Sequence, residues 1–434
     1  MKTALLNQPY QWSSEGLIRK WMRWALFFFL MASLFGLAMR YFFIGDLPYF
    51  EYTHLLHAHS HIALLGWGYL LVTGCLVSLY VKNPTRTKTY KVLFTGSIVS
   101  TLGMMASFPV QGYGLYSITF STLHLLFSYG FAYHFLKDLG SSKGKLDKTL
   151  IRFSIWWMLL SSLGLWAIAP IGAILGKLHP LYTLSVQWFL HFQFNGWFIY
   201  ALLGMLVYLA QGRSMRIQVN PWVMVSLHLS LICTYALTVT WHLPTAGLLS
   251  INAIGVSLQF LAYISILYPV FKKLFPFSGL PIVYEEKILY AGLLFLGLKA
   301  LIQLTLVFPD AAAASHEVRG FVIGFIHLIM LGAISFGVGG ILLMRKILPS
   351  SMESRWGWTL LLAAFVFSEL LLFTQGLMQW QQWGTLPNYH KLIFYASALF
   401  PVSLGLIGLG SLRATPSKSF SKLSPKTEKA VLVH

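Results

Sequence analysis

Apolar stretches long enough to cross a lipid bilayer recur along almost the whole chain. A transmembrane α-helix needs about 20 mostly apolar residues. A window of that length predicts twelve spans, near 22–44, 54–81, 90–110, 114–137, 149–176, 180–210, 221–243, 247–275, 285–308, 317–344, 356–384 and 388–412. We therefore expect an all-α polytopic membrane protein, with residues 1–412 as a single transmembrane helical domain. The polar, basic segment 413–434 is expected to be a disordered tail.

The composition excludes a soluble globular protein. Hydrophobic residues make up 57% of the 434-residue chain and charged residues only 10%, whereas a soluble domain carries about 25% charged residues. Both cysteines, Cys75 and Cys233, lie in apolar runs, which argues against a disulfide scaffold and a cysteine-based metal site. The first span follows a polar segment that includes Glu15, and no small-residue cleavage site follows it, so we expect a retained helix.

The distribution of Lys and Arg predicts the orientation of the spans. If the N-terminus is cytoplasmic, the loops on that side carry nearly all of the 31 basic residues. The exceptions are Arg40, Lys177, Arg319 and Lys391 in outer loops and Lys299 inside a span. This pattern satisfies the positive-inside rule at every loop and places both termini, including the basic tail, in the cytoplasm. Topology thus explains the net charge of +19. We expect the protein to lie in a lipid bilayer, the inner (plasma) membrane of a bacterium. We do not expect it to bind nucleic acid.

Several of the fourteen histidines lie inside predicted spans. With the N-terminus inside, the even-numbered spans run from the outer to the inner side. His61, His124, His191 and His327 lie on four of these spans, about 10–17 Å below the outer end, and His242 closes the outer end of the seventh span. Helix bundles build cofactor sites from inward-facing side chains, and imidazole is the commonest metal ligand. We therefore expect at least one haem or metal site in the outer half of the membrane.

The helical pattern of the second span limits this hypothesis. His54, His57 and His61 share one helical face by their i, i+3, i+7 spacing, while His59 points the other way. A single buried histidine is also often only a hydrogen-bonded core residue. Not all of these histidines can therefore be ligands.

Three short motifs around these histidines resemble the haem-copper oxidase superfamily, specifically the catalytic subunit (subunit I) of cytochrome oxidases and nitric oxide reductases. HSHIALLGW at 59–67 is similar to the second-helix H-A-H-x-N-L-L-G-W of divergent members. GFIH at 324–327 is similar to the tenth-helix A-H-F-H, and WFLHFQFNGW at 188–197 to the sixth-helix metal-binding motif. The family also has twelve spans and a cytoplasmic N-terminus.

This resemblance implies two sites. The first is a low-spin haem b between His61 and His327, with His59 as the alternative to His61. The second is a copper or iron site at His191, with His124 or His242 assisting. A redox partner subunit or a quinone would exchange electrons with the haem.

Departures from the family motifs fall on the second site. Phe325 stands where the family has the histidine of the high-spin haem, and phenylalanine cannot ligate iron. The histidine pair of the copper site is matched only by Trp241-His242, and Asn195 stands where oxidases have a tyrosine and nitric oxide reductases a glutamate. The resemblance therefore implies a bis-histidine haem protein with a degenerate second metal site. Such a protein transfers electrons or handles nitric oxide or oxygen, and the missing ligands argue against full oxygen reduction.

A second resemblance leads to a related function. HLIMLGAISFGVGGILLMR at 327–345 is similar to the H-x-x-x-x-G-A-I-G segment of the NnrS family, which implies a haem protein of nitric oxide stress. The sequence contains no P-loop, H-E-x-x-H or C-x-x-C-H motif, which argues against a nucleotide-driven pump, a zinc peptidase and covalently attached haem.

Two charged residues near the middle of spans support a different class of protein. A midplane Lys or Glu costs several kcal/mol unless it is paired. Lys299 and Glu369 are therefore expected to form a structural ion pair or, with Asn195, a proton path; Lys299 is also a candidate contact for haem propionates. A cofactor-free, proton-coupled transporter would use the same residues. Such transporters contain internal repeats or broken helices, and neither is evident in the sequence.

Overall fold

The computed structural model describes residues 15–212, 217–243, 245, 247–275 and 282–413. All but the first residue of the expected tail, 413–434, lies outside the described residues. The elements in chain order are α1 (Glu15–Tyr41), α2 (Tyr52–His61), η1 (Ile62–Gly68), α3 (Tyr69–Tyr80), η2 (Pro84–Arg86), α4 (Thr87–Gln111), α5 (Leu115–Leu139), α6 (Leu146–Ile174), α7 (Pro180–His191), η3 (Phe192–Phe198), α8 (Ile199–Gln211), α9 (Pro221–His242), α10 (Leu248–Leu274), α11 (Tyr284–Leu304), η4 (Thr305–Val307), α12 (Pro309–Glu317), α13 (Arg319–His327), η5 (Leu328–Phe336), α14 (Gly337–Met344), α15 (Met352–Trp380) and α16 (Tyr389–Arg413).

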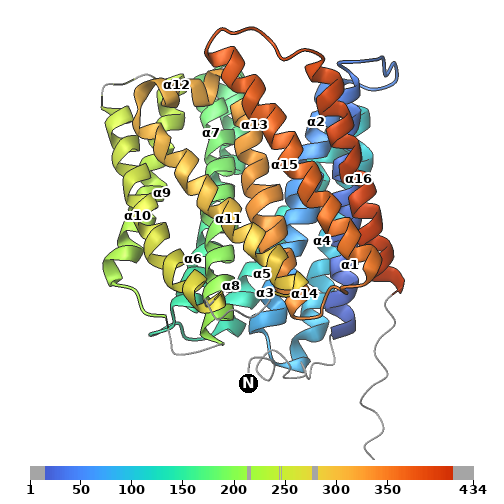
Figure 1. Cartoon of the computed structure of the whole chain (residues 1–434), viewed down its shortest axis with the longest axis vertical. Coiled ribbons are helices and arrows are strands. Elements are labelled where there is room, and N and C mark those ends of the chain that lie inside the picture. Colours follow the sequence, from blue (N-terminus) through green and yellow to red (C-terminus); the bar gives the residue numbers. More distant parts are fainter. Residues whose placement is uncertain (1–14, 213–216, 244, 246, 276–281, 414–434) are drawn as a thin grey trace, which may run out of the picture.

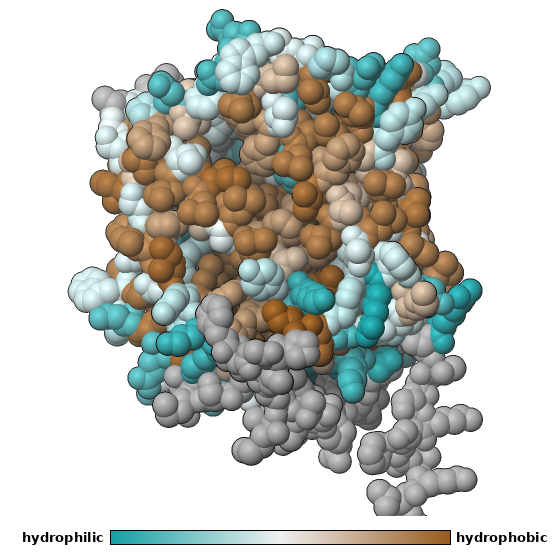
Figure 2. Space-filling view, in the orientation of Figure 1, coloured by the Kyte–Doolittle hydropathy of each residue, from teal (hydrophilic) through white to brown (hydrophobic). Residues whose placement is uncertain are grey.

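The all-α membrane fold is confirmed. Long helices run roughly parallel to one another through the molecule (Figure 1), and the described residues contain no strand. A broad apolar band crosses the visible face between hydrophilic ends (Figure 2), as a protein that crosses a bilayer requires.

The number of spans differs from the sequence prediction. Eleven helices within the described residues are long and apolar enough to cross a membrane. The remaining expected span is the fourth in chain order, 114–137. It forms α5, which has 25 residues. Its Ser, Thr, Tyr and His residues dilute its apolar character, so α5 is a helix of spanning length but is not among the eleven.

Three spans differ from the others because each contains a π-helical segment. These are the continuous helices 52–80, 180–211 and 319–344, interrupted by η1, η3 and η5. Buried residues make up 89%, 89% and 61% of their most apolar windows, the highest fractions among the eleven spans. They therefore form the centre of the bundle. Short π segments inside α-helices often mark functional sites, and the sequence did not reveal these three.

The contacts between elements repeat three times along the chain. The first helix of each group of four, α1, α6 or α11, packs along the central span of its own group. The third helix, α4, α9 or α15, packs against the N-terminal part of that span and against the fourth helix. The fourth helices α5, α10 and α16 contact α6, α11 and α1, which closes a ring. The C-terminal segments of the central spans, α3, α8 and α14, contact one another. The structure therefore contains an internal repeat that the sequence analysis did not detect.

Candidate functional site

Each π segment begins directly after one histidine of the layer identified in the sequence. His61, His191 and His327 are the residues that precede η1, η3 and η5. Each is followed five residues later by a glycine, in HIALLG, HFQFNG and HLIMLG. A side chain at these glycines would collide with neighbouring helices; a Cβ at Gly196, for example, would lie 2.7 Å from Trp157 Cβ. The repeated H-x-x-x-x-G pattern is the sequence signal that marks the three central spans, and the sequence analysis missed it.

The structure brings His327 close to His59. The two side chains, from α13 and α2, are near enough to interact electrostatically. The Nδ1 atom of His59 lies 2.8 Å from the carbonyl oxygen of Ala32 on α1. No hydrogen bond to its Nε2 atom is found within the described part of the chain. His59 therefore has one ring nitrogen anchored by the backbone and the other available to a ligand.

His327 has a carboxylate beside it, at a distance beyond a direct hydrogen bond. Its Nδ1 atom lies 3.6 Å from Oε1 of Glu369 on α15. Glu369 is 8% exposed, and neither of its oxygens has a hydrogen-bond partner within the described residues. Gly324 makes room for this carboxylate, because a Cβ there would lie 3.2 Å from Oε2 of Glu369. A carboxylate beside one ring nitrogen is the usual arrangement that orients a histidine whose other nitrogen binds a metal.

A cation completes this cluster. Arg40, near the end of α1, interacts electrostatically with His59, His327 and Glu369 and hydrogen-bonds Tyr389 at the start of α16. We call His59, His327, Glu369 and Arg40 the histidine-pair cluster. From the sequence, Arg40 was predicted only as an outer-loop charge, because nothing there places it beside histidines from other spans.

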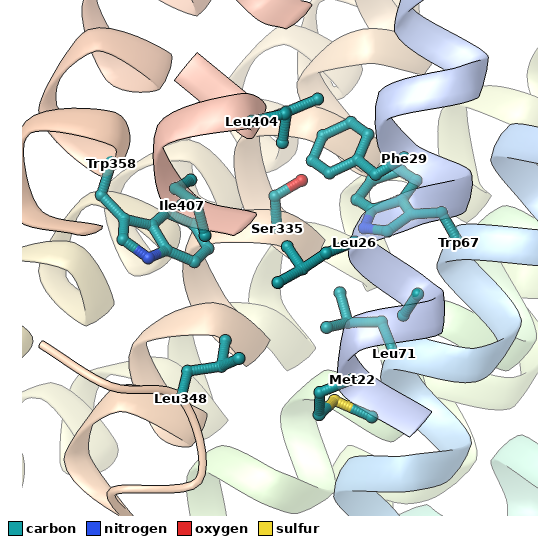
Figure 3. Close-up of a pocket in the computed structure, with 11 residues that line it drawn as sticks. Met22, Leu26, Phe29, Trp67, Leu71, Ser335, Leu348, Trp358, Leu404 and Ile407 are labelled. Atoms are coloured by element: carbon teal, nitrogen blue, oxygen red, sulfur yellow. The ribbon is translucent and has the colours of Figure 1, made fainter. Parts of the chain in front are cut away.

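An apolar pocket lies further along the same helices (Figure 3). It is formed by α1, the second and tenth spans, α15 and α16, and its lining residues are Met22, Ala25, Leu26, Phe29, Trp67, Leu71, Ser335, Leu348, Trp358, Leu404 and Ile407. Phe29 and Trp67 stack on each other at one side of it, with ring centroids 4.0 Å apart. Along α1 the order is pocket, then the carbonyl that holds His59, then Arg40. Along the tenth span, Ser335 follows His327 by eight residues, or about 12 Å.

His61 lies on the opposite face of the second span. Its ring packs on Phe108 with centroids 4.2 Å apart, its Nδ1 atom lies 2.9 Å from the carbonyl of His57, and its Nε2 atom lies 3.4 Å from the hydroxyl of Tyr113. Burial raises the pKa of Tyr113, which lies between two helices, to about 12, so its phenol stays protonated. The expected division of faces within the second span is confirmed. The pairing of His61 with His327 stays a prediction, and these contacts favour the alternative ligand, His59.

The three histidines expected at a second metal have different surroundings. The Nε2 atom of His191 lies 2.9 Å from the carbonyl oxygen of Leu231. His124 packs edge-on against Tyr69 and hydrogen-bonds the backbone of the second span, and its Nε2 atom has no partner within the described residues. His242 lies beside His316, with ring centroids 6.2 Å apart. Across the described residues, no group of three or more His, Cys, Asp or Glu side chains is placed to hold a metal ion.

Lys299 and Glu369 do not form the structural ion pair that the sequence analysis offered as one interpretation. Lys299 is 0% exposed, and its Nζ atom donates to Oε1 of Gln259 and to the hydroxyl of Tyr263, both at 3.3 Å. It interacts electrostatically with His191, and Glu369 faces the histidine pair instead. Lys299 lies over the ring of Phe325 and Glu369 lies beside His327. The two charges therefore face different sides of the tenth span. The amide and phenol partners of Lys299 were not identified from the sequence.

No protein-family model matches this chain, and no curated protein matches it at a significant level. The evidence for membership of a family therefore remains the resemblance of the short motifs. What the structure establishes is an all-helical protein with a membrane-spanning architecture and a histidine-pair cluster beside an apolar pocket.

Proposed function

We propose that this protein is an integral membrane haem protein that transfers electrons, with one haem b between His59 and His327. One observation carries the proposal. Nδ1 of His59 lies 2.8 Å from a backbone carbonyl oxygen and Nδ1 of His327 lies 3.6 Å from a carboxylate oxygen, and no hydrogen bond to either Nε2 is found within the described residues. This is the arrangement that presents two histidines to one metal.

The residues around the pair fit the two chemically different edges of a haem. The pocket lined by Phe29, Trp67 and Leu404 is apolar, which suits the hydrocarbon edge. Arg40 lies at the other end of the cluster, where it would pair with propionates. Glu369 would hold the His327 ring in one orientation. Haem with two axial imidazoles supplies one-electron transfer without an open coordination position.

Haem alone, without a second metal, is the composition that we propose. Lys299 interacts electrostatically with His191, where the resemblance implies the second metal. An ammonium group there repels a metal cation, and one nitrogen of His191 is already engaged by a carbonyl. The haem-copper oxidase resemblance is thus proposed for the haem site only, and the work of the site is electron transfer rather than oxygen reduction.

The orientation in the membrane is part of the same proposal. We propose that α5 is the twelfth span, because an even number of spans gathers the basic loops on one side. Both termini then lie in the cytoplasm, and the histidine-pair cluster lies in the outer half of a bacterial inner membrane. The redox partner would be a further subunit or a quinone.

A reduced-minus-oxidised absorption spectrum of the purified protein tests the haem site. Sharp α and Soret bands should be present in the native protein and absent in His59→Ala and His327→Ala. His61→Ala is the matched control, because it removes a histidine from the opposite face of the same helix, and it should keep the bands. Bands lost in His61→Ala but kept in His59→Ala would instead assign the haem to His61. A featureless spectrum after expression with ample haem would overturn the haem proposal and favour transport. Metal analysis should find iron without stoichiometric copper.

A further inference from the structure

The buried ammonium group of Lys299 is only partly satisfied. An ammonium group has three N–H donors, and two of them are used by Gln259 and Tyr263. Both bonds are long, at 3.3 Å. Within the described residues no partner is found for the third donor. A buried charged donor without an acceptor is costly, so we expect a further group to accept a hydrogen bond from this third N–H.

Three buried amide oxygens, on α10, α11 and the sixth span, lack donors within the described residues. Gln303 is one turn beyond Lys299 on the same face of α11, and its Oε1 atom has no partner within the described residues. The Oδ1 atoms of Asn195 and Asn252 are equally unpartnered in that part of the chain. These three side chains are 5%, 7% and 1% exposed. Unpaired donors and acceptors in one buried region are normally bridged by ordered water.

Asn252 and Gln259 on α10 and Lys299 and Gln303 on α11 form a column along the contact between these two helices. Asn252 donates from Nδ2 to the carbonyl of Leu306 in η4 at 3.0 Å, so the start of α10 and the end of α11 lie together. Asn252 and Gln259 are seven residues apart and share a face of α10. The polar groups therefore continue from that end of the bundle down to Lys299.

The column ends at the sixth span. His191 interacts electrostatically with Lys299, and Nδ2 of Asn195 lies 3.4 Å from the carbonyl of His191. Within the described residues, two titratable groups surround the ammonium of Lys299: His191 from α7 and Tyr263 from α10. From α13, the ring of Phe325 also faces it. The tenth span thus separates this column from Glu369.

We propose that bound water fills this column and that Lys299 and His191 exchange protons through it with the aqueous phase at the end where α10 begins. The proposal goes beyond the haem site and shares no residue with it. Within the described residues, no cluster of metal-binding side chains is found and no carboxylate contacts Lys299, which favours proton exchange over metal binding. In the proposed orientation, the column opens to the outer side of the membrane.

X-ray hydroxyl-radical footprinting tests for the water. Radicals generated from bound water modify adjacent aromatic side chains even when these are buried. Tyr263, 1% exposed, should be modified, whereas Phe131, also 1% exposed but stacked on Phe135, should not, each relative to the unfolded chain. Gln303→Leu, which removes one acceptor at similar volume, should lower the modification of Tyr263 about fivefold, the factor that one ordinary hydrogen bond represents. Equal protection of Tyr263 and Phe131 would overturn the proposal.

Deuterium exchange at the imidazole C2 position tests the proton exchange. This exchange proceeds through the protonated ring and requires hydroxide, so it reports whether both reach His191. It should be slower by about fivefold in Gln303→Leu and in Asn252→Leu. Leu301→Ala, on the lipid-facing side of α11 with Leu301 53% exposed, should leave it unchanged.

Equal exchange at His191 in the native protein and in both column variants refutes the proposed route. Thermal unfolding of both variants shows whether they are folded. Each replaces an amide whose oxygen lacks a partner within the described residues, and Asn252→Leu also removes the hydrogen bond to the carbonyl of Leu306, so the larger loss of stability is expected there. Neither measurement uses haem absorption, so both give the same answer whether or not the haem proposal holds.

Discussion

Glu369 is the residue on which the haem proposal makes its sharpest prediction. Its Oε1 atom lies 3.6 Å from Nδ1 of His327. For two unit charges at that distance, Coulomb's law gives about 5 kcal/mol at an effective dielectric constant of 20 and about 1 kcal/mol in water. About a quarter of the His327 side chain is accessible (27%) but only 10% of that of Glu369, and a ligating imidazole carries only part of a unit charge. The effect should therefore lie in the lower part of this range.

We expect Glu369→Gln to weaken haem binding about 10–100-fold, or about 1.4–2.8 kcal/mol, the usual loss when the partner of a metal-binding histidine is changed. Glu369→Ala should lose at least as much, because it also removes the oxygen that faces the ring. The loss of the negative charge should raise the midpoint potential of the haem. Haem affinity is measured by transfer to an excess of apomyoglobin, and the potential by a spectroscopic redox titration.

A glutamate elsewhere on the same helix provides the control. Glu353 begins α15 and pairs with Arg413 at 2.9 Å, far along the helix from His327. Glu353→Gln should leave haem affinity and potential unchanged. If both substitutions at position 369 change haem affinity by less than about twofold, the carboxylate does not orient the ligand and the reasoning fails.

Two further predictions concern stability, each measured by thermal unfolding in detergent. Lys299→Met should raise the free energy of unfolding by about 1–3 kcal/mol, because transferring the ammonium from water into the protein interior costs more than its two long hydrogen bonds return. A lower unfolding temperature would contradict this. Gly292→Ala should lower it by about 3 kcal/mol or more, since the new Cβ would lie 2.2 Å from the backbone nitrogen of Gly337. On the same helix, Gly297→Ala meets nothing within 4 Å and should be neutral or stabilising by up to about 1 kcal/mol; equal effects at the two glycines would refute the packing argument.

Much of the candidate site could be identified from residue types and spacing. His59, His327 and Glu369 were all candidates, because ionisable or coordinating side chains inside a span are costly and therefore mark functional sites. What spacing could not supply was the choice between His59 and His61. Residues two apart on a helix point about 200° away from each other, and only the packing of α1 and α13 shows which face meets His327.

The repeat of four-helix groups could not be recognised from the sequence either. Its trace is limited to three H-x-x-x-x-G segments, at 61–66, 191–196 and 327–332, because most side chains at a helix contact need only be apolar and of suitable size. Close approach is more demanding, so the glycines remain as the visible signal.

The sequence by itself determined that this chain is an all-helical membrane protein, where most of its spans lie and which residues are candidates for chemistry. These properties follow from local composition, because a bilayer imposes a fixed apolar length and a strong cost on buried charge. The tertiary structure decided the partners: His59 with His327, Glu369 behind His327, and Lys299 with Gln259 and Tyr263. These contacts join helices far apart in the chain, and the rotation of each helix about its axis is set by packing against its neighbours, which no single segment encodes.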